Sequence, residues 1–378
     1  MHIIIAPDSF KECLSAQQVA HAIAEGWRRV APDDVLTEVP LADGGEGTTV
    51  ALVNAQNGSL HSCSVTDPMG MRVTAQYGLL DNGSTAVMEV AEASGLHRVP
   101  PQNRNALIAS SRGTGELILA ALQHRPRSLI IGLGGSATTD AGVGLLQALG
   151  ASFTDADRNE LPPGGAALMR LAHMDIAAAR KLLEGVEITL ATDVSNDLLG
   201  SQGAAAVYSP QKGASPDEVA QLERCLQHYA ECAHAHGFTV NGFSGSGAAG
   251  GIGASLQGLL GATLVSGVET VIRAVNLEQH MSGADVVITG EGSLDGQSAS
   301  GKVPVGVCRL AQKYGVPVIA LAGVVGDSLE SLYALGLTAA FAITPGPLSR
   351  EASFASAEHN LAARAEQLAR LLHATVVK

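Results

Sequence analysis

The sequence is poor in aromatic residues and in positive charge. Only 3% of its 378 residues are Phe, Trp or Tyr, so the core must be built from aliphatic side chains. The chain has 23 Lys and Arg against 36 Asp and Glu, which gives a net charge of −13. Surfaces for nucleic acid or anionic membranes need clustered Lys and Arg. The composition therefore argues against both partners, while a phosphate held by backbone N–H groups, a metal and a few local cations stays compatible with it.

Patterns typical of secreted and membrane proteins are missing as well. The five cysteines are scattered and include no C-x-x-C pair, which suits free thiols in a reducing compartment. Residues 1–6 predict a strand and lack the basic region and apolar stretch of a signal peptide. The longest uncharged run, 238–268, is rich in Gly, Ser, Asn and Gln, so it predicts a buried loop and helix rather than a membrane span. We expect a cytoplasmic protein that does not bind a membrane.

Glycine, in contrast, is abundant. It makes up 44 of the 378 residues, which is well above its usual share of about 7%. Three glycine-rich loops, 42–47, 134–140 and 289–295, each follow an apolar run and also carry hydroxyl or carboxylate side chains. One such loop is more often a tight strand-to-helix turn. Glycines bring backbone N–H groups close to an anion, and carboxylates can hold a divalent metal beside it. Three loops of this kind predict a site for a metal-bound phosphate.

Strand and helix signals alternate at both ends of the chain. The strand-like runs are residues 3–6, 35–41, 284–288, 316–322 and 339–343. This alternation predicts parallel sheets with helices on both faces. In between, turn sequences at 67–70 and 81–83 flank alternating runs, which is typical of an antiparallel meander. We therefore expect an α/β fold with two α/β domains, a discontinuous one over 1–64 and 283–378 and a mixed one inserted over 65–282.

Polar residues follow other predicted strands. Asp8, Ser9 and Lys11 come after the first strand, and Asp193 comes after a strand predicted over 187–191. Ligands of open parallel sheets bind at the carboxyl ends of strands, so these side chains are candidates for contact with substrate. Arg112 opens a predicted helix and offers a bidentate guanidinium to a carboxylate or phosphate. Turn formation and solvated surface charge remain alternatives for each of them.

Two further glycine patterns only partly match nucleotide-binding motifs. Residues 296–303 nearly form a phosphate-binding P-loop, but Val303 replaces the Ser or Thr that ligates magnesium. Lys302 can still contact a phosphate there. Residues 245–250 match the dinucleotide fingerprint without a clear preceding strand. Close backbone packing at a helix start is the preferred interpretation of this second pattern.

The loops also belong to a longer series of segments that resembles the signature of bacterial type-I glycerate kinases, with small departures at Thr139 and Gly296. The segments are Ile-Ala-Pro-Asp-Ser-Phe-Lys (5–11), Ala-Asp-Gly-Gly-Glu-Gly (42–47), Ser-Arg-Gly-Thr-Gly-Glu (111–116), Gly-Leu-Gly-Gly-Ser-Ala-Thr (132–138), Pro-Gln-Lys-Gly-Ala (210–214), Gly-Ala-Ala-Gly-Gly-Ile-Gly (247–253), Thr-Gly-Glu-Gly (289–292) and Gly-Lys-Val-Pro (301–304). The resemblance implies ATP- and Mg²⁺-dependent phosphorylation of D-glycerate to 2-phosphoglycerate, in cytoplasmic glyoxylate and sugar-acid metabolism. It also implies two α/β domains, one with a Rossmann-like, doubly wound parallel sheet, and an active site in the cleft between them.

Phosphoryl transfer depends mainly on positioning and charge neutralisation, and this leads to a hypothesis for each group. Mg²⁺ is expected to bind carboxylates from Asp193, Glu291 and Asp295. Asp193 is expected near the attacking hydroxyl, and Lys11 and Asp295 are the other catalytic candidates. The glycerate-binding candidates are Asp8, Ser9, Asp43 and Arg112, with Arg112 or Lys11 on the carboxylate. The nucleotide-binding candidates are Gly134, Gly135, Ser136, Gly290, Gly292 and Lys302.

Alternatives remain open at this point. The 3-hydroxyl of glycerate is a second acceptor, which would give 3-phosphoglycerate. The pattern at 245–250 keeps a nicotinamide-dependent oxidoreductase of a small hydroxy acid as a rival, and a non-catalytic metabolite sensor of the same fold is another. The oligomeric state is undetermined, with a homodimer as one option.

Overall fold

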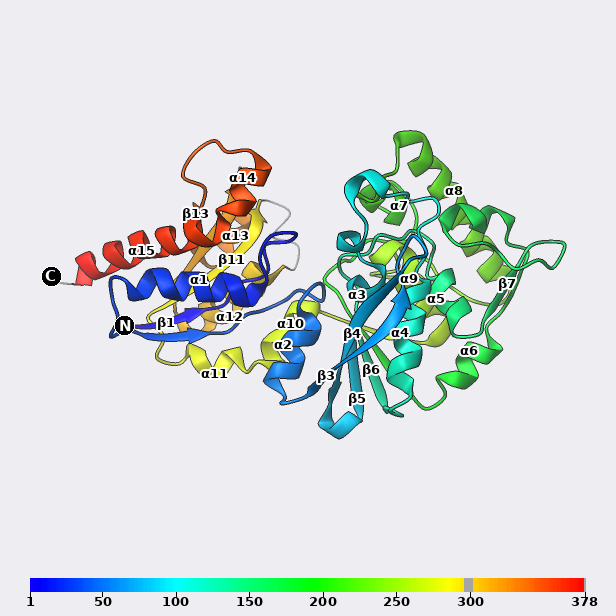
Figure 1. The fold of residues 1–378 in the computed structure, drawn as a ribbon, viewed down its shortest axis with the longest axis horizontal. Helices are drawn as coiled ribbons and strands as arrows, with labels where there is room; N and C mark the ends of the chain where they lie inside the picture. Colours follow the sequence, from blue (N-terminus) through cyan, green and yellow to red (C-terminus); the bar gives the residue numbers. More distant parts are fainter. Residues whose placement is uncertain (296–301, 377–378) are drawn as a thin grey trace. The chain divides into compact units, whose positions relative to one another are not determined.

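The computed structural model describes residues 1–295 and 302–376, and the chain divides into two compact units. Unit 1 comprises Met1–Asp43 and Val268–Lys378, and unit 2 is the continuous segment Gly44–Gly267 (Figure 1). The sequence analysis put the first boundary at residue 64, whereas the structure groups 44–64 with unit 2. The reason is strand pairing, because β3 (Ser59–Thr66) is hydrogen-bonded along its length to β4 (Arg72–Leu80).

Unit 1 contains a five-stranded, fully parallel sheet in the order β13-β12-β11-β1-β2. Its strands are β1 (His2–Ile5), β2 (Val35–Glu38), β11 (Val286–Leu294), β12 (Val318–Val325) and β13 (Leu337–Ala342). Counted within the unit, this is the 2-1-3-4-5 order of doubly wound sheets, and the winding direction reverses between β1 and β11. The predicted α/β class with a doubly wound parallel sheet is confirmed.

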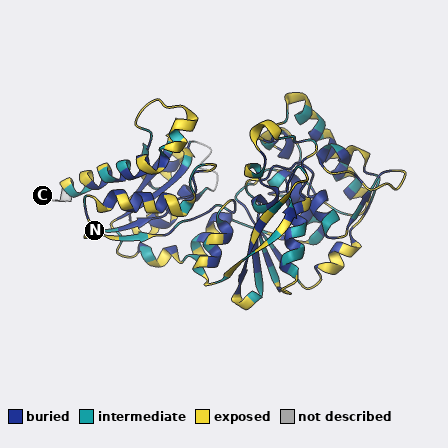
Figure 2. Ribbon diagram, viewed as in Figure 1, coloured by how far each residue is buried: buried dark blue, intermediate teal, exposed yellow. Residues whose placement is uncertain are grey.

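Helices cover both faces of this sheet. They are α1 (Ala16–Arg28), α10 (Gly267–Ala274), α11 (Leu277–Met281), α12 (Val303–Tyr314), α13 (Glu330–Ala334), α14 (Arg350–Ala355) and α15 (Ala357–Val376). Successive side chains of a strand point to opposite faces. Ile3 and Ile5 accordingly pack in one apolar cluster with α1 and α15, and the buried Ile4 lies outside that cluster. The inner strands β1, β11 and β12 are largely buried (Figure 2), whereas the edge strands β2 and β13 are partly exposed.

The side chain of Asp34 hydrogen-bonds to both the first residue of the chain and the carboxy-terminal helix. Asp34 accepts hydrogen bonds from Trp27 Nε1 at 2.8 Å and from His373 Nε2 at 2.9 Å. The amino terminus of Met1 donates to the same carboxylate at 2.6 Å. Burial alone would raise the pKa of Asp34, but these hydrogen bonds hold it below its usual value. Asp34 thus links α1, α15 and the first strand.

Unit 2 contains a six-stranded mixed sheet in the order β10-β9-β6-β5-β4-β3. Its further strands are β5 (Thr85–Glu89), β6 (Ser128–Gly132), β9 (Glu187–Ala191) and β10 (Thr263–Val265), and β7 (Ser152–Thr154) pairs separately with β8 (His173–Asp175). The strands β3, β4 and β5 form the antiparallel meander that the turn sequences predict, and β5, β6, β9 and β10 run parallel. The mixed α/β character expected for the second domain is therefore present.

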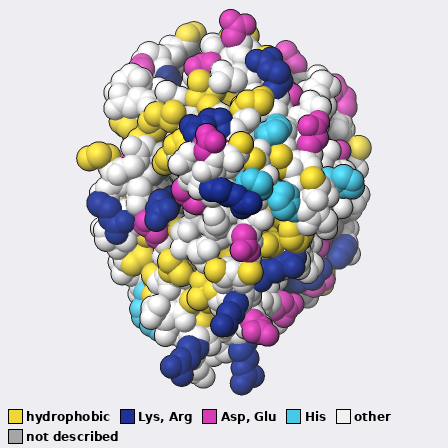
Figure 3. Space-filling view, turned by 90° about the vertical axis from the view of Figure 1, so that its right-hand side faces the viewer, with side chains coloured by type: hydrophobic (Ala, Val, Ile, Leu, Met, Phe, Trp, Pro, Cys, Tyr) yellow, Lys and Arg dark blue, Asp and Glu magenta, His cyan; other side chains and the backbone are white. Residues whose placement is uncertain are grey.

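The helices of unit 2 surround this sheet and its aliphatic core. They are α2 (Thr48–Ala55), α3 (Val90–Ser94), α4 (Arg112–Leu122), α5 (Val143–Ala148), α6 (Ala177–Leu182), α7 (Ala204–Tyr208), α8 (Pro216–Ala235) and α9 (Ala248–Leu260), with a short 3-10 turn η5 (Pro210–Lys212). Among the described residues, no helix combines the length and the apolar character needed to cross a bilayer. On the face shown in Figure 3, Lys and Arg side chains are interspersed with Asp, Glu and scattered apolar groups.

Candidate active site

The carboxyl edge of the unit 1 sheet brings several predicted site residues together. Asp8 and Ser9 follow β1, and Asp43 follows β2. The two strands pair in parallel. The backbone N–H of Asp8 donates to the carbonyl of Gly290 in β11 at 2.8 Å. These residues therefore lie beside the point between β1 and β11 where the winding reverses, which is the usual ligand position in a doubly wound sheet.

Two lysines at this edge each form an ion pair with a carboxylate. Lys11 Nζ lies 3.3 Å from Asp43 Oδ2, and Lys302 Nζ lies 3.2 Å from Glu291 Oε2. Asp8 is only 2% exposed, and burial together with the Asp43 carboxylate raises the pKa of Asp8 well above its usual value. The charge of Asp43 in turn raises the pKa of Lys11 and keeps it an ammonium. We call Asp8, Lys11, Asp43, Glu291 and Lys302 the charged edge.

Strand β11 is longer than the sequence predicts. Residues 289–295 were expected to form a glycine-rich loop, but β11 continues to Leu294 because its residues pair with β12, from Gly290 opposite Leu321 to Leu294 opposite Val325. Gly290 therefore lies inside a sheet, where a side chain would overlap the Leu321 carbonyl. Gly292 is also part of the strand, and Asp295 follows it directly. Residues 296–301 of the P-loop-like stretch lie outside the described residues.

In unit 2 the predicted nucleotide loop follows β6. Gly134 is already engaged, because its N–H donates to the carbonyl of Gly44 at 3.2 Å. This contact brings two of the glycine-rich loops together. The N–H groups of Gly135 and Ser136, in contrast, have no hydrogen-bond partner among the described residues. Consecutive unengaged N–H groups in a glycine-rich turn are donors of the kind that bind phosphate oxygens.

The three predicted metal ligands are divided between the units. Asp193 follows β9 in unit 2, is partly buried, and accepts a hydrogen bond from Ser266 Oγ at 2.7 Å. Glu291 and Asp295 belong to unit 1. Within the described part of the chain, no three His, Cys, Asp or Glu side chains converge closely enough to hold a metal ion. Mg²⁺ is usually held by one or two carboxylates together with phosphates and water, so the donors on β11 suit it in type.

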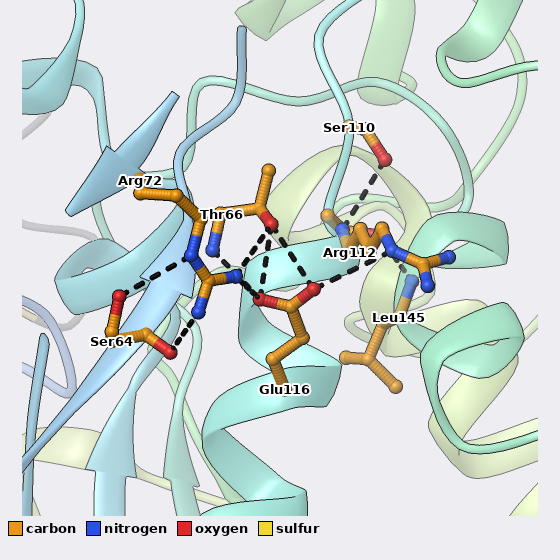
Figure 4. A network of polar contacts seen from close by, with 8 residues as sticks. Ser64, Thr66, Arg72, Ser110, Arg112, Glu116 and Leu145 are labelled. Carbon is orange, nitrogen blue, oxygen red and sulfur yellow. Dashed lines mark hydrogen bonds and ion pairs between the residues drawn. The ribbon is translucent and has the colours of Figure 1, made fainter. Parts of the chain in front are cut away.

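Arg112 begins α4 and takes part in a network of polar side chains (Figure 4). Its Nε lies 3.5 Å from Glu116 Oε1. Glu116 also binds Arg72 at 2.9 Å and accepts the backbone N–H of Thr66 at 2.8 Å. The Arg112 side chain is 50% exposed, and its two terminal nitrogens have no partner among the described residues. The network thus fixes the stem of Arg112 and leaves the end of its guanidinium accessible.

The sequence analysis missed two buried ionisable residues beside the unit 2 loops. Glu89 is 3% exposed and accepts the backbone N–H groups of Thr49 at 2.6 Å and Gly47 at 3.2 Å, at the start of α2. Burial raises the pKa of Glu89 to about 8. Lys212, 2% exposed, contacts the loop after β6 from the side of η5. The family-like segment 210–214 was the only sequence signal for Lys212, and Glu89 had none.

The dinucleotide-like pattern at 245–250 has a structural explanation. Gly250 has a φ of +66°, and a Cβ atom there would overlap the carbonyl of Thr138. A Cβ on Gly247 would overlap the carbonyl of Asp197. The glycines therefore permit close backbone packing at the start of α9, which confirms the interpretation preferred from the sequence.

A doubly wound parallel sheet with acids and lysines at its carboxyl edge, together with a second α/β unit that has a mixed sheet, defines a two-unit protein of the α/β class. A sequence model of the glycerate kinase family matches residues 3–373. The chain belongs to the glycerate kinase family. It is 45% identical over 373 residues to the glycerate 2-kinase of Escherichia coli K12, with 98% of each chain covered. It is 46% identical over 370 residues to the glycerate kinase of Bacillus subtilis 168, covering 98% of this chain and 97% of that one.

The fold is shared with a solved relative as well. A crystal structure from Salmonella typhimurium LT2, provisionally assigned as glycerate kinase 2, superposes with a TM-score of 0.79 at 44% identity. The match covers 100% of this chain and 99% of that one. The similarity therefore extends over both units rather than over one of them.

Proposed function

We propose that the protein transfers the γ-phosphoryl group of ATP to the 2-hydroxyl of D-glycerate, giving 2-phosphoglycerate and ADP, with Mg²⁺ as cofactor. Family membership over residues 3–373 carries this proposal. The E. coli relative named glycerate 2-kinase supports the choice of the 2-hydroxyl. The charged edge and the loop after β6 supply donors and charges of the types that the reaction needs.

In this proposal the chain positions the reactants and offsets their charge. The N–H groups of Gly135 and Ser136 donate to phosphate oxygens. Gly134 belongs to the same loop, and its own N–H group holds the loop against Gly44. Lys302 and Lys11 offset the negative charge of the phosphates at the edge of unit 1. Gly290 and Gly292 allow the β11 backbone to come close to these phosphates. When bound, Mg²⁺ neutralises phosphate charge, and Glu291 and Asp295 would hold it.

The acceptor side uses the remaining candidates. Asp193 takes the proton of the attacking hydroxyl as the new O–P bond forms and the bond to the bridging oxygen of ADP breaks. The Ser266 hydrogen bond at 2.7 Å orients this carboxylate. Asp8, Ser9 and Asp43 hydrogen-bond the glycerate hydroxyls. Arg112 binds the glycerate carboxylate through its accessible nitrogens.

The cellular setting is part of the proposal. The five cysteines, all free thiols in the structure, support a reducing cytoplasm. A role in glycerate, glyoxylate and sugar-acid catabolism follows from the proposed substrate. Phosphorylation of the 3-hydroxyl is the second candidate, because several relatives carry the name glycerate kinase without a position.

A coupled ADP-release assay tests the function. We expect Mg²⁺-dependent turnover with D-glycerate well above that with L-glycerate, lactate or simple sugars. Phosphorus NMR of the product then distinguishes 2- from 3-phosphoglycerate. A folded preparation that phosphorylates another hydroxy acid but not glycerate would overturn the assignment, and turnover without added divalent metal would overturn the role of Mg²⁺.

A further inference from the structure

Lys212 is a buried cation that the proposed mechanism does not use. It ends η5 and is 2% exposed. Its Nζ donates to Ser136 Oγ at 3.1 Å and to the carbonyl of Thr138 at 2.6 Å. The neighbouring Ser209 reinforces the contact, because its hydroxyl lies 3.1 Å from Thr139 Oγ1. Two residues of one segment therefore support the loop that follows β6.

The charge of Lys212 has no counter-ion among the described residues. Asp140 is the titratable group whose charge acts on it. The Asp140 carboxylate is itself held by Ser111 and by the N–H groups of Gly142 and Gly144. Burial lowers the pKa of Lys212 to about 7, although Asp140 opposes this shift. A buried ammonium without an anion is costly, so the site suits a negative charge that residues 1–295 and 302–376 do not supply.

The loop around Lys212 also has unused donors. The N–H groups of Gly135 and Ser136 have no partner among the described residues. Ser136 Oγ accepts from Lys212, which leaves its own proton for another acceptor. Thr138 is fully buried, and its Oγ1 has no partner in the described structure. One of the three N–H bonds of the Lys212 ammonium is likewise unused. Several unused donors on one loop, beside a cation without a counter-ion among the described residues, suit an anion with more than one oxygen.

We propose that Lys212 completes a phosphate subsite on the loop 134–139 and acts as a positioning residue through Ser136. A phosphate oxygen of the nucleotide accepts the N–H groups of Gly135 and Ser136 and the Ser136 hydroxyl, while the buried ammonium compensates its charge. This inference rests on the proposed nucleotide-dependent function and adds to it the residue that makes the loop selective for phosphate. Binding of the anion stabilises the charged form of Lys212.

Equilibrium binding of ATP and the steady-state constants for D-glycerate test the subsite. Lys212→Met keeps the length of the side chain and removes its charge, and Lys212→Arg keeps the charge. Lys181→Met, on the exposed end of α6, is the matched control for loss of one positive charge. We expect Lys212→Met to weaken ATP binding at least about tenfold and to change KM for D-glycerate by less than about twofold. Lys212→Arg should recover part of the affinity, and Lys181→Met should match the wild type.

Two outcomes would overturn the subsite. One is folded Lys212→Met protein with wild-type affinity for ATP. The other is a loss of affinity for ATP that is matched by an equal rise in KM for D-glycerate. Failure of the proposed function is separate, because wild-type protein that binds ATP without phosphorylating glycerate would leave the subsite standing.

A second measurement needs no variant at Lys212. Calorimetric titration with ATP should show weaker binding by Ser136→Ala than by wild-type protein, because the variant loses the hydroxyl that accepts from Lys212. Wild-type affinity for ATP in Ser136→Ala would refute the proposal even if Lys212→Met does not fold.

Discussion

Glu89 gives unit 2 a stability that should fall as the pH rises. Its pKa is about 8 in the folded protein against an ordinary value of 4.5, because the carboxyl is buried. Between these two values the folded chain holds a proton that the unfolded chain has released, so the free energy of unfolding decreases with increasing pH. At about 1.4 kcal/mol per pKa unit, the difference corresponds to roughly 4–5 kcal/mol between pH 4.5 and pH 8. Above pH 8 the loss is complete.

Glu89→Gln removes this titration but keeps only one acceptor oxygen, whereas the N–H groups of Thr49 and Gly47 bind different carboxylate oxygens. We therefore compare pH dependence: the free energy of unfolding of the variant should gain a few kcal/mol relative to that of wild type between pH 5 and pH 9. Urea unfolding followed by far-UV circular dichroism measures both. Trp27 is the single tryptophan and lies in unit 1, so its fluorescence reports separately on the other unit. Glu184→Gln, at an exposed carboxylate, is the control. Parallel pH profiles for wild type and Glu89→Gln would refute the reasoning.

The remaining predictions concern the active site and the packing. Asp193→Asn and Asp295→Asn should each lower kcat at least about a hundredfold with the Tm nearly unchanged; loss of folding with normal activity per folded molecule would indicate a structural role. Asp34→Asn should cost roughly 1–3 kcal/mol in urea unfolding, because three donors lose a charged acceptor; an unchanged midpoint would contradict this. Gly250→Ala should lower the Tm without any effect on NADH binding, which should be absent in wild type too; saturable NADH binding that the change removes would reverse the interpretation. Val303→Ser should give no gain in activity with limiting Mg²⁺, and a strong gain would restore the P-loop hypothesis.

Most of the architecture could be predicted from the sequence, because strand, helix and turn patterns depend on residues close together in the chain. Alternating strand and helix runs predicted the parallel sheet of unit 1, and the turn sequences at 67–70 and 81–83 predicted the meander of unit 2. The extent of β11 could not be predicted, since Gly290, Glu291 and Gly292 in its second half have weak strand preference. Their pairing with β12 decides the conformation, and that pairing is a tertiary contact.

For the candidate site, the sequence predicted the strand-end positions of the residues but not their contact partners. Asp8 and Asp43 lie at one edge because the parallel strands β1 and β2 end on the same side of the sheet. Lys212 could not be found in this way. Lys212 is buried and contacts Ser136, 76 positions earlier in the chain, and the sequence reports neither burial nor a missing counter-ion.

The discontinuity of unit 1 has a consequence for how the chain is made. Strand β1 is an inner strand that pairs with β2 and with the central β11, and Thr289 of β11 donates a hydrogen bond to the carbonyl of Ala6, which is 283 positions earlier. On the ribosome, the emerging β1 and β2 must therefore wait for most of translation before their sheet can close. Gly44–Gly267 is continuous, and it is completed first. Domains generally fold as units during synthesis, so the inserted unit is the natural first folding nucleus, and the amino-terminal segment is exposed longest to aggregation or to chaperones.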